Sequence, residues 1–488
     1  MTSGSSRRPE RCFGNASFDR GREFFGSGWG ALSVPFVLAA CVTGPAVDTV
    51  APPAARASPT SVEVRVQHAD GEVRTHSSPR LAQQLEADGV GKELLVHHLA
   101  HVEDVLAAPL VLGNDAHLLI DGPATYRAMF EAIEKARRHV HLETYILESG
   151  EQGDRLAGLL AAKRQQGVEV RVLYDSVGSL ETPPRYFEGL AAAGIAVCEF
   201  NPVNPLKLAG DPRLSLNNRD HRKLLVIDGQ VAFTGGINIS GVYRAGSFGS
   251  KRRVPTRDEG WRDTHVMVRG PVVAQFEELF NDAWRDQRCP APVVRQAKNR
   301  LTEPVGSMAM RLVAADPVSE RSELYVALMS ALEHARERAW LTYGYFVPDE
   351  RTLHSLRDAA QRGVDVRLVL PGFSDFWAPF HAGRSHYQDL LGAGVRIFER
   401  RDALLHAKTA VIDGVWSSVG STNLDWRSFV HNFEADVLVL DGVFADEMEE
   451  LFSLDQSASH EVRLEQWKDR GVRARLLEWL ARRWEYFL

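Results

Sequence analysis

The chain has 488 residues, of which 44% are apolar and 25% charged, and its formal net charge is −7. This length predicts two or three domains, and this apolar fraction excludes a chain that is disordered throughout. The acidic balance argues against nucleic-acid binding through the whole surface, although it allows a local basic site. The four cysteines are too few for a disulfide scaffold and show no zinc-binding spacing.

Residues 1–41 have the order of parts expected of a secretory signal. Several arginines precede a short apolar segment, 29–40, which ends in the string LAAC at Cys41. We therefore predict a lipoprotein-type signal peptide over residues 1–40, with lipidation of Cys41. The alternative is an unstructured start that contains a chance cysteine. No run of 18 or more apolar residues occurs, so we expect no ordinary membrane-spanning helix.

Residues 41–105 are predicted to form a Pro- and Ala-rich tether followed by a small N-terminal region. Beyond residue 105 the chain repeats one pattern twice. A helix-like segment and a strand-like segment occupy 124–147 and again 322–347, and further apolar strands follow each of them. This alternation predicts α/β folding, with two repeated α/β/α sandwich domains, 106–300 and 301–488, related by pseudo-twofold symmetry.

The two halves differ in one connection. An insertion at 201–220 precedes the first chemical motif, and the second half has no counterpart to it. Such a loop either shapes a substrate pocket or is a tolerated surface insertion, and the sequence leaves both open. Cys198 lies just before it in an apolar run, which is typical of a buried thiol. A bridge to Cys289 is compatible with the sequence but not required by it.

Two copies of one motif carry the residues best suited to chemistry. Each copy reads HxKx4D, followed by a glycine-rich segment that ends in asparagine: His221, Lys223, Asp228 and Asn238, then His406, Lys408, Asp413 and Asn423. The residues between the histidine and the aspartate are apolar and β-branched, which predicts strands. On a strand, a histidine and a lysine two residues apart face the same side. We take the HxKx4D residues as the candidate catalytic set and the asparagines as candidate phosphate ligands. The two aspartates stand at a predicted turn, where we expect them to hold the fold locally.

The combined side chains of the two motifs suit a phosphodiester. The lysines and asparagine amides would stabilise negative charge on the phosphate oxygens. One histidine would attack phosphorus and form a covalent intermediate, while the other protonates the leaving alkoxide and activates the incoming alcohol. This chemistry requires no metal ion or other cofactor. A single motif would be weak evidence, but two copies at equivalent places in a repeat are much stronger.

The paired motifs resemble the phospholipase D superfamily over roughly residues 105–488. Four further strings are similar to cardiolipin synthases: GWRDTHVMVRGPVVAQFEELFNDAW (260–284), YFVPDE (345–350), STNLDWRSFVHNFEADV (421–437) and EQWKDR (465–470). The resemblance implies a phosphohistidine intermediate at the interface of two sandwich domains, formed without a metal. It also implies that Asp263 and Glu434 each orient one histidine.

By the same resemblance, His221 is the nucleophile and His406 is the general acid and base. The sequence alone is too symmetric to separate these two roles. Ser421 and Ser428 are weaker candidates for contact with phosphate or with the residues around it.

The resemblance implies transfer of a phosphatidyl group from one phosphatidylglycerol to another at a membrane surface, with release of glycerol. The first alternative is the same chemistry with water as acceptor, which yields phosphatidic acid. A nuclease is disfavoured by the acidic composition and the predicted lipid anchor, so we expect no nucleic-acid partner. A non-catalytic lipid-binding lipoprotein is disfavoured by the two intact motifs.

We expect a bacterial, membrane-associated protein, lipid-anchored on the periplasmic side. N-terminal membrane helices are common in cardiolipin synthases, whereas this sequence has a predicted lipoprotein signal in their place. The sequence therefore does not decide which face of the membrane the site serves.

The C-terminal segment has the pattern of a basic amphipathic helix. Leu477, Leu480, Trp484 and Phe487 are spaced for one helical face, with Arg473, Arg475, Arg482 and Arg483 around them. Such a helix suits a membrane interface, and the alternative is a helix packed on the protein body.

Overall fold

The structure is a computed structural model, and it describes residues 61–68, 71–85, 89–203, 217–247, 260–290, 303–317, 321–483 and 485. The predicted signal peptide, Cys41 and the tether up to residue 60 lie outside the described residues. So do residues 204–216 of the insertion, whose role therefore stays a prediction. Among the described residues, no helix is both long enough and apolar enough to cross a membrane.

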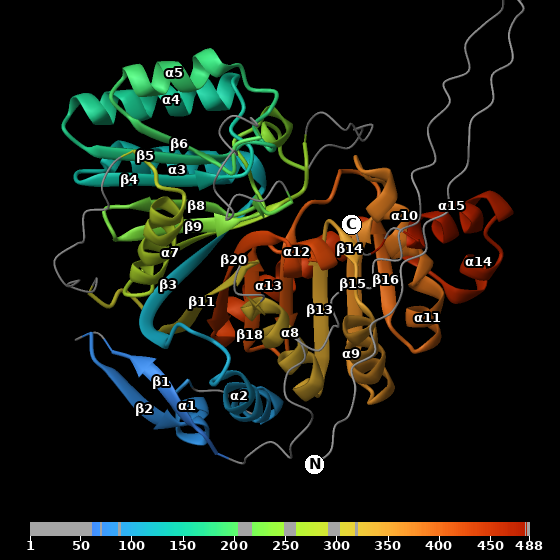
Figure 1. The fold of residues 1–488 in the computed structure, drawn as a ribbon. Helices are drawn as coiled ribbons and strands as arrows, with labels where there is room; N and C mark the ends of the chain where they lie inside the picture. The colour runs from blue at the N-terminus through green and yellow to red at the C-terminus, as the bar shows by residue number, and fades with distance from the viewer. Residues whose placement is uncertain are drawn as a thin grey trace, which may run out of the picture. The chain divides into compact units, whose positions relative to one another are not determined.

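The first half is built on neighbouring strands of one sheet (Figure 1). Their order across the sheet is β6 (Ala196–Phe200), β5 (Glu169–Asp175), β4 (His139–Thr144), β8 (Lys223–Ile227), β9 (Val231–Gly235), β10 (Thr264–Arg269) and β3 (Leu110–Ile120). β4, β5 and β6 run parallel, and the pairs from β4–β8 onward are antiparallel. The short strand β7 (Arg219–Asp220) leads into β8.

The second half repeats this order. Its strands are β16 (Arg396–Arg400), β15 (Asp365–Pro371), β13 (Arg338–Tyr343), β17 (Lys408–Ile412), β18 (Trp416–Gly420), β20 (Asn432–Leu440) and β11 (Met308–Asp316). At the far edge, β21 (Ser459–Val462) pairs with β16. β3 and β11 pair antiparallel and join the two halves into one sheet.

Each half is a sandwich because strand residues alternate between two cores. In β8, Leu225 and Ile227 face the core under α3 (Asp121–Lys135), α4 (Glu151–Gln165) and α5 (Pro184–Ala192). Leu224 and Val226 face a second core, which contains residues of α7 (Val273–Asp286) and α13 (Gly442–Ser457). In the second half, α8 (Glu323–His334), α9 (Glu350–Gln361) and α11 (Tyr387–Gly392) cover the face opposite α13. The prediction of two repeated α/β/α sandwiches is confirmed.

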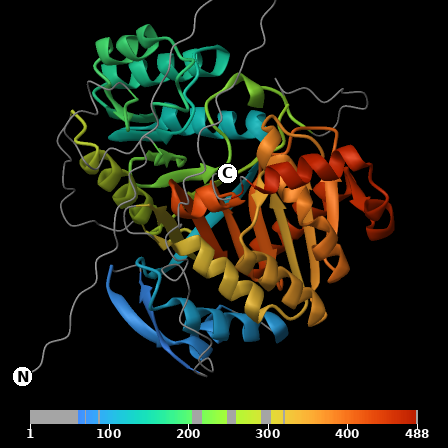
Figure 2. The same cartoon turned by 45° about the vertical axis from the view of Figure 1, so that its right-hand side comes forward.

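The small N-terminal region belongs to the core of the second half. It consists of β1 (Glu63–Gln67), β2 (Val73–Ser77), α1 (Ser78–Gln84) and α2 (Gly89–Val102). Its buried apolar residues share one cluster with α8, β13 and β17. Two polar contacts fix it further: Glu103 pairs with Arg311 at 2.9 Å, and the His98 ring accepts from Trp416 Nε1 at 3.2 Å. Figure 2 shows this region below the second half.

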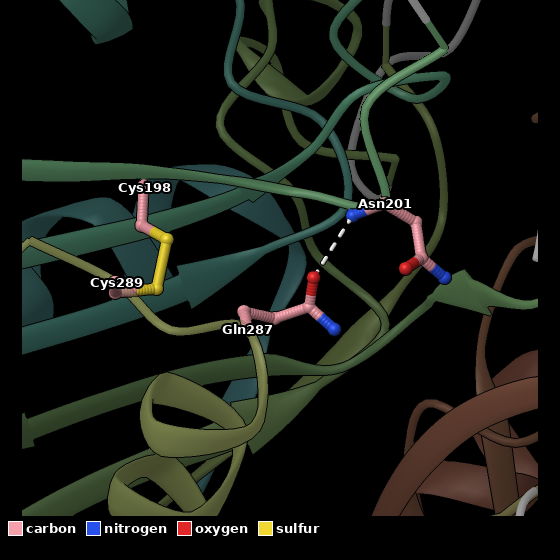
Figure 3. Close-up of a disulfide and its surroundings, with 4 residues drawn as sticks. All are labelled: Cys198, Asn201, Gln287 and Cys289. Atoms are coloured by element: carbon pink, nitrogen blue, oxygen red, sulfur yellow. Dashed lines mark hydrogen bonds between the residues drawn. A yellow bond between two sulfur atoms is a disulfide. The ribbon is translucent and has the colours of Figure 1, made fainter. Parts of the chain in front are cut away.

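Cys198 and Cys289 form a disulfide, with their Cα atoms 5.5 Å apart (Figure 3). The interpretation of Cys198 as a buried thiol was therefore wrong. Cys198 lies on β6, and Cys289 follows the end of α7, so the bond ties this helix to the edge strand of the first half. Beside it, the Asn201 backbone N–H donates to Gln287 Oε1 at 3.2 Å.

Candidate active site

His221 is held by a carboxylate from the other half of the molecule. β7 pairs in parallel with the start of β20, and the His221 N–H donates to the Phe433 carbonyl at 2.9 Å. This pairing places Glu434 beside the ring, with both carboxyl oxygens 2.9 Å from His221 Nδ1. Because Nδ1 faces the carboxylate, Nε2 is the ring nitrogen left for chemistry. His221 lies just before β8 rather than inside it, so the strand predicted for the motif begins two residues later, at Lys223.

His406 is held by the reciprocal arrangement. The chain before it forms a parallel bridge between Leu405 and Arg262, and the His406 N–H donates to the Arg262 carbonyl at 2.8 Å. Asp263 then lies with Oδ2 2.8 Å from His406 Nδ1. Each histidine is thus oriented by a carboxylate from the opposite half.

A buried ion pair fixes the Asp263 segment to the second half. The Arg262 guanidinium donates to both oxygens of Asp455 on α13, at 2.8 and 2.7 Å. Arg400 on β16 also donates to Asp455. Arg262, Arg400 and Asp455 are almost completely buried, so losing one partner of this group would leave buried charge poorly compensated.

The lysines and histidines of the two motifs act on one another electrostatically. Burial lowers the pKa of Lys223 to about 7, and burial also lowers the pKa of Lys408. Burial lowers the pKa of His221 well below its ordinary value, and the positive charges of Lys223, Lys408 and His406 lower it further. The cationic groups of the two halves therefore share one buried site, where an anion would relieve their mutual repulsion.

The two carboxylates differ in charge. Burial raises the pKa of Glu434 to about 7, although Lys223 and a hydrogen bond from Ser421 oppose this effect. Burial alone would also raise the pKa of Asp263, but the charge of His406 and its hydrogen bond outweigh burial, and the pKa is lowered. Near neutral pH, Asp263 is therefore a carboxylate, whereas Glu434 is partly protonated.

The predicted phosphate ligands and serines lie in this region. Asn238 Oδ1 accepts from the Ile146 N–H at 3.1 Å, which orients the amide. The Asn423 amide nitrogen donates to Ser428 Oγ at 3.4 Å. Ser421 Oγ donates to Glu434 at 2.6 Å, so this serine contacts a carboxylate that orients a histidine. The Ser428 backbone N–H donates to Asp425, which caps α12 (Trp426–Val430).

The motif aspartates bind backbone instead of pointing toward the histidines. The carboxylate of Asp228 accepts from the N–H groups of residues 137–139 at 2.7–2.9 Å, at the start of β4. Asp413 accepts from those of residues 336–338 at 2.8–2.9 Å, at the start of β13. Both adopt positive φ, 55° and 48°, at the turn that follows their strand. Asp228 and Asp413 were candidates for the catalytic set, but their contacts are those of residues that hold the fold locally, as expected from their place at a turn.

Sequence reasoning did not single out three tyrosines at the site. Tyr243, at the end of the 3₁₀ turn Gly241–Tyr243, lies with its hydroxyl 3.2 Å from His406 Nδ1. Tyr145 and Tyr345 occupy matching places in the two halves. Their rings lie 5.1 Å from the His221 ring and 5.8 Å from the His406 ring, respectively. Tyr145 directly follows β4, and Tyr345 stands two residues after the end of β13, so their places in the repeat were a usable signal.

Among the described residues, one group of three side chains offers ligand atoms for a metal ion: His139, His141 and Glu277. The sequence had shown no such cluster, because Glu277 comes from α7 and the histidines from β4. The Glu277 carboxylate lies 3.0 Å from His139 Nε2 and 2.8 Å from His141 Nδ1, through different oxygens. Each carboxyl oxygen thus lies within ion-pair distance of one imidazole nitrogen. The group lies at the opposite end of β4 from Thr144, the residue that pairs with Lys223.

Comparison with known proteins places this geometry in a family. A family model described as "Cardiolipin synthase, PLD-like domain" matches residues 129–245 and 328–455, once in each half. The chain belongs to the cardiolipin synthase family of the phospholipase D superfamily. Both matched segments contain one complete HxKx4D motif, so the resemblance inferred from the sequence is confirmed.

Members of the cardiolipin synthase family align along most of this chain. Cardiolipin synthase A of Pseudomonas fluorescens (strain SBW25) is 37% identical over 360 residues, which cover 73% of this chain and 72% of that protein. Cardiolipin synthase of Geobacillus thermodenitrificans is 35% identical over 380 residues, covering 77% and 72%. The fold is also similar to the crystal structure of a phosphatidylserine synthase from Haemophilus influenzae, with a TM-score of 0.57 at 12% identity, over 76% of this chain and 95% of that one.

Proposed function

We propose that this chain is a cardiolipin synthase, which transfers a phosphatidyl group from one phosphatidylglycerol to a second one through a phosphohistidine. The observation that carries this proposal is the crossed pairing of the two histidines. Each ring is oriented through Nδ1 by a carboxylate of the other half, at 2.8–2.9 Å. The positive charges of both motif lysines act on the buried ring of His221 and lower its pKa. This arrangement suits attack and proton transfer at a single phosphorus.

In the first step, His221 Nε2 attacks the phosphorus of phosphatidylglycerol, and the bond from phosphorus to the headgroup glycerol oxygen breaks. His406 gives a proton to that oxygen, and glycerol leaves. In the second step, His406 takes the proton from the headgroup hydroxyl of another phosphatidylglycerol. The resulting alkoxide attacks phosphorus, the bond to His221 breaks, and cardiolipin is released. Lys223 and Lys408 stabilise the charge on the non-bridging oxygens throughout.

The electrostatic difference between the histidines supports this division of roles. The pKa of His221 is lowered well below its ordinary value, so its ring is neutral and carries the lone pair that a nucleophile needs. His406 faces Asp263, whose carboxylate favours a protonated ring. Burial and the charge of Lys408 lower the pKa of His406, although the charge of Asp263 and its hydrogen bond oppose this effect. An anionic phosphodiester in the site would raise this pKa toward the value that a general acid needs.

We infer that the enzyme works at a membrane from an exported position. The Cys198–Cys289 disulfide supports export, because such bonds persist in oxidising compartments such as the bacterial periplasm. Lipidation of Cys41 stays a prediction from the sequence. Metabolic labelling with a palmitate analogue tests it, and absence of label on the wild-type chain would contradict it.

The function is tested by incubating purified protein with phosphatidylglycerol vesicles and identifying the products by mass spectrometry. His221→Ala should abolish turnover, while His354→Ala, a change at an exposed histidine on α9, should have no effect. Cardiolipin with an equal amount of glycerol supports the proposal. Phosphatidic acid alone would instead identify a hydrolase, and cleavage only of added single-stranded DNA a nuclease. A folded wild-type protein with no turnover of any phosphodiester would indicate a lipid-binding module.

A further inference from the structure

Exposed apolar side chains are concentrated on two helices of the second half. They are α10 (Trp377–Ser385) and α15 (Val472–Arg482). Of the twelve large apolar side chains exposed in the described part of the chain, half lie on these helices or directly before them: Phe376, Trp377, Val472, Leu476, Trp479 and Leu480. Both tryptophans exposed among the described residues are in this set, which we call the apolar rim. Single exposed apolar residues are ordinary, but such a concentration indicates a contact surface.

The two helices that carry the apolar rim are packed together. Ala382 of α10 and Ala481 of α15 share a buried cluster with Val347. Figures 1 and 2 both show α10 and α15 side by side at the edge of the second half. The buried face of α15 carries Glu478 and Ala481, with Leu477 half-buried beside them. Val472, Leu476 and Trp479 form a stripe on another face, spaced by four and three residues.

This finding corrects the sequence interpretation of the C-terminal helix. Leu477, which was expected on the exposed apolar face, is half-buried against the protein, while Leu480 is exposed. Trp484 and Phe487 lie outside the described residues. The helix therefore combines the two alternatives: it packs on the protein body through one face and presents a different apolar stripe outward.

The exposed charge of α15 is positive, although the chain as a whole is acidic. Arg473, Arg475, Arg482 and Arg483 are all exposed on or directly after α15. The Arg483 guanidinium lies 4.6 Å from the centre of the Trp479 ring, so one cation directly flanks the apolar stripe. The acidic groups that face Arg482, Glu350 and Glu485, are each 3.9 Å away, beyond hydrogen-bond distance. Arginine beside tryptophan and leucine suits the boundary between lipid headgroups and acyl chains.

The apolar rim is also connected to the active site. Asp375, directly before Phe376, accepts a hydrogen bond of 2.7 Å from the Tyr345 hydroxyl, and the Tyr345 ring lies against His406. On the inner side of α10 there is a hollow lined mainly by apolar side chains, among them Tyr345, Phe346, Leu370 and Phe380. The start of α10 is therefore linked to Tyr345, whose ring lies beside His406.

We propose that the apolar rim docks on an anionic phospholipid bilayer and brings the active site to its lipid substrate. Phe376, Trp377, Leu476 and Trp479 enter the boundary between headgroups and acyl chains, while the arginines of α15 bind anionic headgroups. The inference rests on the proposed function only in taking the substrate to be a lipid. The surface itself is argued from exposure, packing and charge.

The test measures sedimentation with vesicles, using full-length protein that carries Cys41→Ser in every arm so that acylation cannot anchor it. The test variant is Trp377→Ser with Leu476→Ser and Trp479→Ser. The matched control is Val443→Ser with Leu454→Ser, which removes exposed apolar side chains of α13, a helix that does not belong to the apolar rim. Removal of three half-exposed anchors should weaken partition onto phosphatidylglycerol-containing vesicles about 100-fold, whereas the control should bind like the parent. Vesicles of phosphatidylcholine alone should bind the parent protein more weakly.

Three results would overturn the proposal: a parent protein that does not bind vesicles, a test variant that binds like the parent, or equal losses in the test and control variants. Self-association through the apolar rim would appear as a parent dimer that the test variant dissolves without loss of vesicle binding, and it would also overturn the proposal. Turnover of a short-chain phosphatidylglycerol, measured below its critical micelle concentration, involves no bilayer. This assay therefore reports on the chemistry separately from membrane docking. Loss of vesicle binding by the test variant but not by the control supports docking, whatever the activity of the parent. A parent that turns over neither the vesicles nor the short-chain lipid would contradict only the proposed function.

Discussion

Replacing Glu434 by glutamine should stabilise the protein at alkaline pH and yet nearly abolish its activity. Burial raises the pKa of Glu434 to about 7, so the folded state retains a proton that the unfolded chain loses at lower pH. The free energy of unfolding therefore falls as pH rises from the unfolded pKa to the folded one, and levels off above it. Glutamine does not titrate, so its advantage over wild type should grow by about 2 to 3 kcal/mol between pH 5 and pH 8.

The surroundings of Glu434 allow this substitution. Oε1 accepts from Asn432 at 3.3 Å, and an amide oxygen would preserve that bond. Oε2 accepts from Ser421 Oγ, whose hydroxyl could turn to the Ala435 carbonyl, 3.3 Å away, and accept from the new amide nitrogen. The cost falls on His221, because glutamine supports its ring less well than a carboxylate does. We expect kcat to fall by between about 100-fold and 10,000-fold.

Urea unfolding at pH 5 and pH 8, with cardiolipin formation measured by mass spectrometry, checks both effects. Glu450→Gln, at an exposed residue of α13, is the control and should change neither. A stability difference between Glu434→Gln and wild type that stays constant or shrinks between these pH values would refute the reasoning. It would mean that Glu434 is fully ionised in the fold and paired with a charged His221.

Three other predictions follow from single contacts. Asp413→Ala should lower the free energy of unfolding by about 3 kcal/mol or more, measured by urea unfolding, because three backbone N–H groups lose their acceptor; a loss below about 0.5 kcal/mol would contradict this. Tyr243→Phe should lower kcat about tenfold with little change in KM, since the hydroxyl contacts His406 Nδ1; steady-state kinetics test it, and a change in KM alone would place the hydroxyl in lipid binding. Cys198→Ser with Cys289→Ser should cost about 2 to 4 kcal/mol of stability, and reductant should destabilise only the wild type; equal melting temperatures of wild type and variant would show that the disulfide does not form.

The repeat and the chemistry were readable from the sequence because they depend on local patterns. Strand alternation and the recurring HxKx4D spacing identified both halves and both His–Lys pairs. The hydrogen bonds of Asp228 and Asp413 could be anticipated in kind, since an aspartate at a turn after a strand often binds backbone. Spacing alone could not reveal which backbone segment each would hold.

Contacts between distant segments were harder to predict. The family resemblance implied that Asp263 and Glu434 each orient one histidine, but it did not say which. The crossed pairing of His221 with Glu434 and of His406 with Asp263 depends on bridges between the halves, which leave no local pattern. The Arg262–Asp455 ion pair is of the same kind, with partners 193 residues apart. In α15 the sequence period was correct, but the packed face was set by α10, so the exposed stripe differed from the expected one.

Trapping the covalent intermediate tests the central claim most directly. A His406→Asn variant retains His221 but lacks both the proposed general acid and the proposed general base. A phosphatidyl ester of p-nitrophenol, whose leaving group needs no protonation, should still transfer its phosphatidyl group to His221, where the group should remain because no base activates an acceptor. Alkaline quenching, digestion and mass spectrometry should then find the adduct on His221 and none in a His221→Ala, His406→Asn double variant. An adduct on another residue would contradict a mechanism with two displacements through His221. Inversion of configuration at a chiral phosphorus during transfer by the wild type would also contradict it, because two displacements retain the configuration.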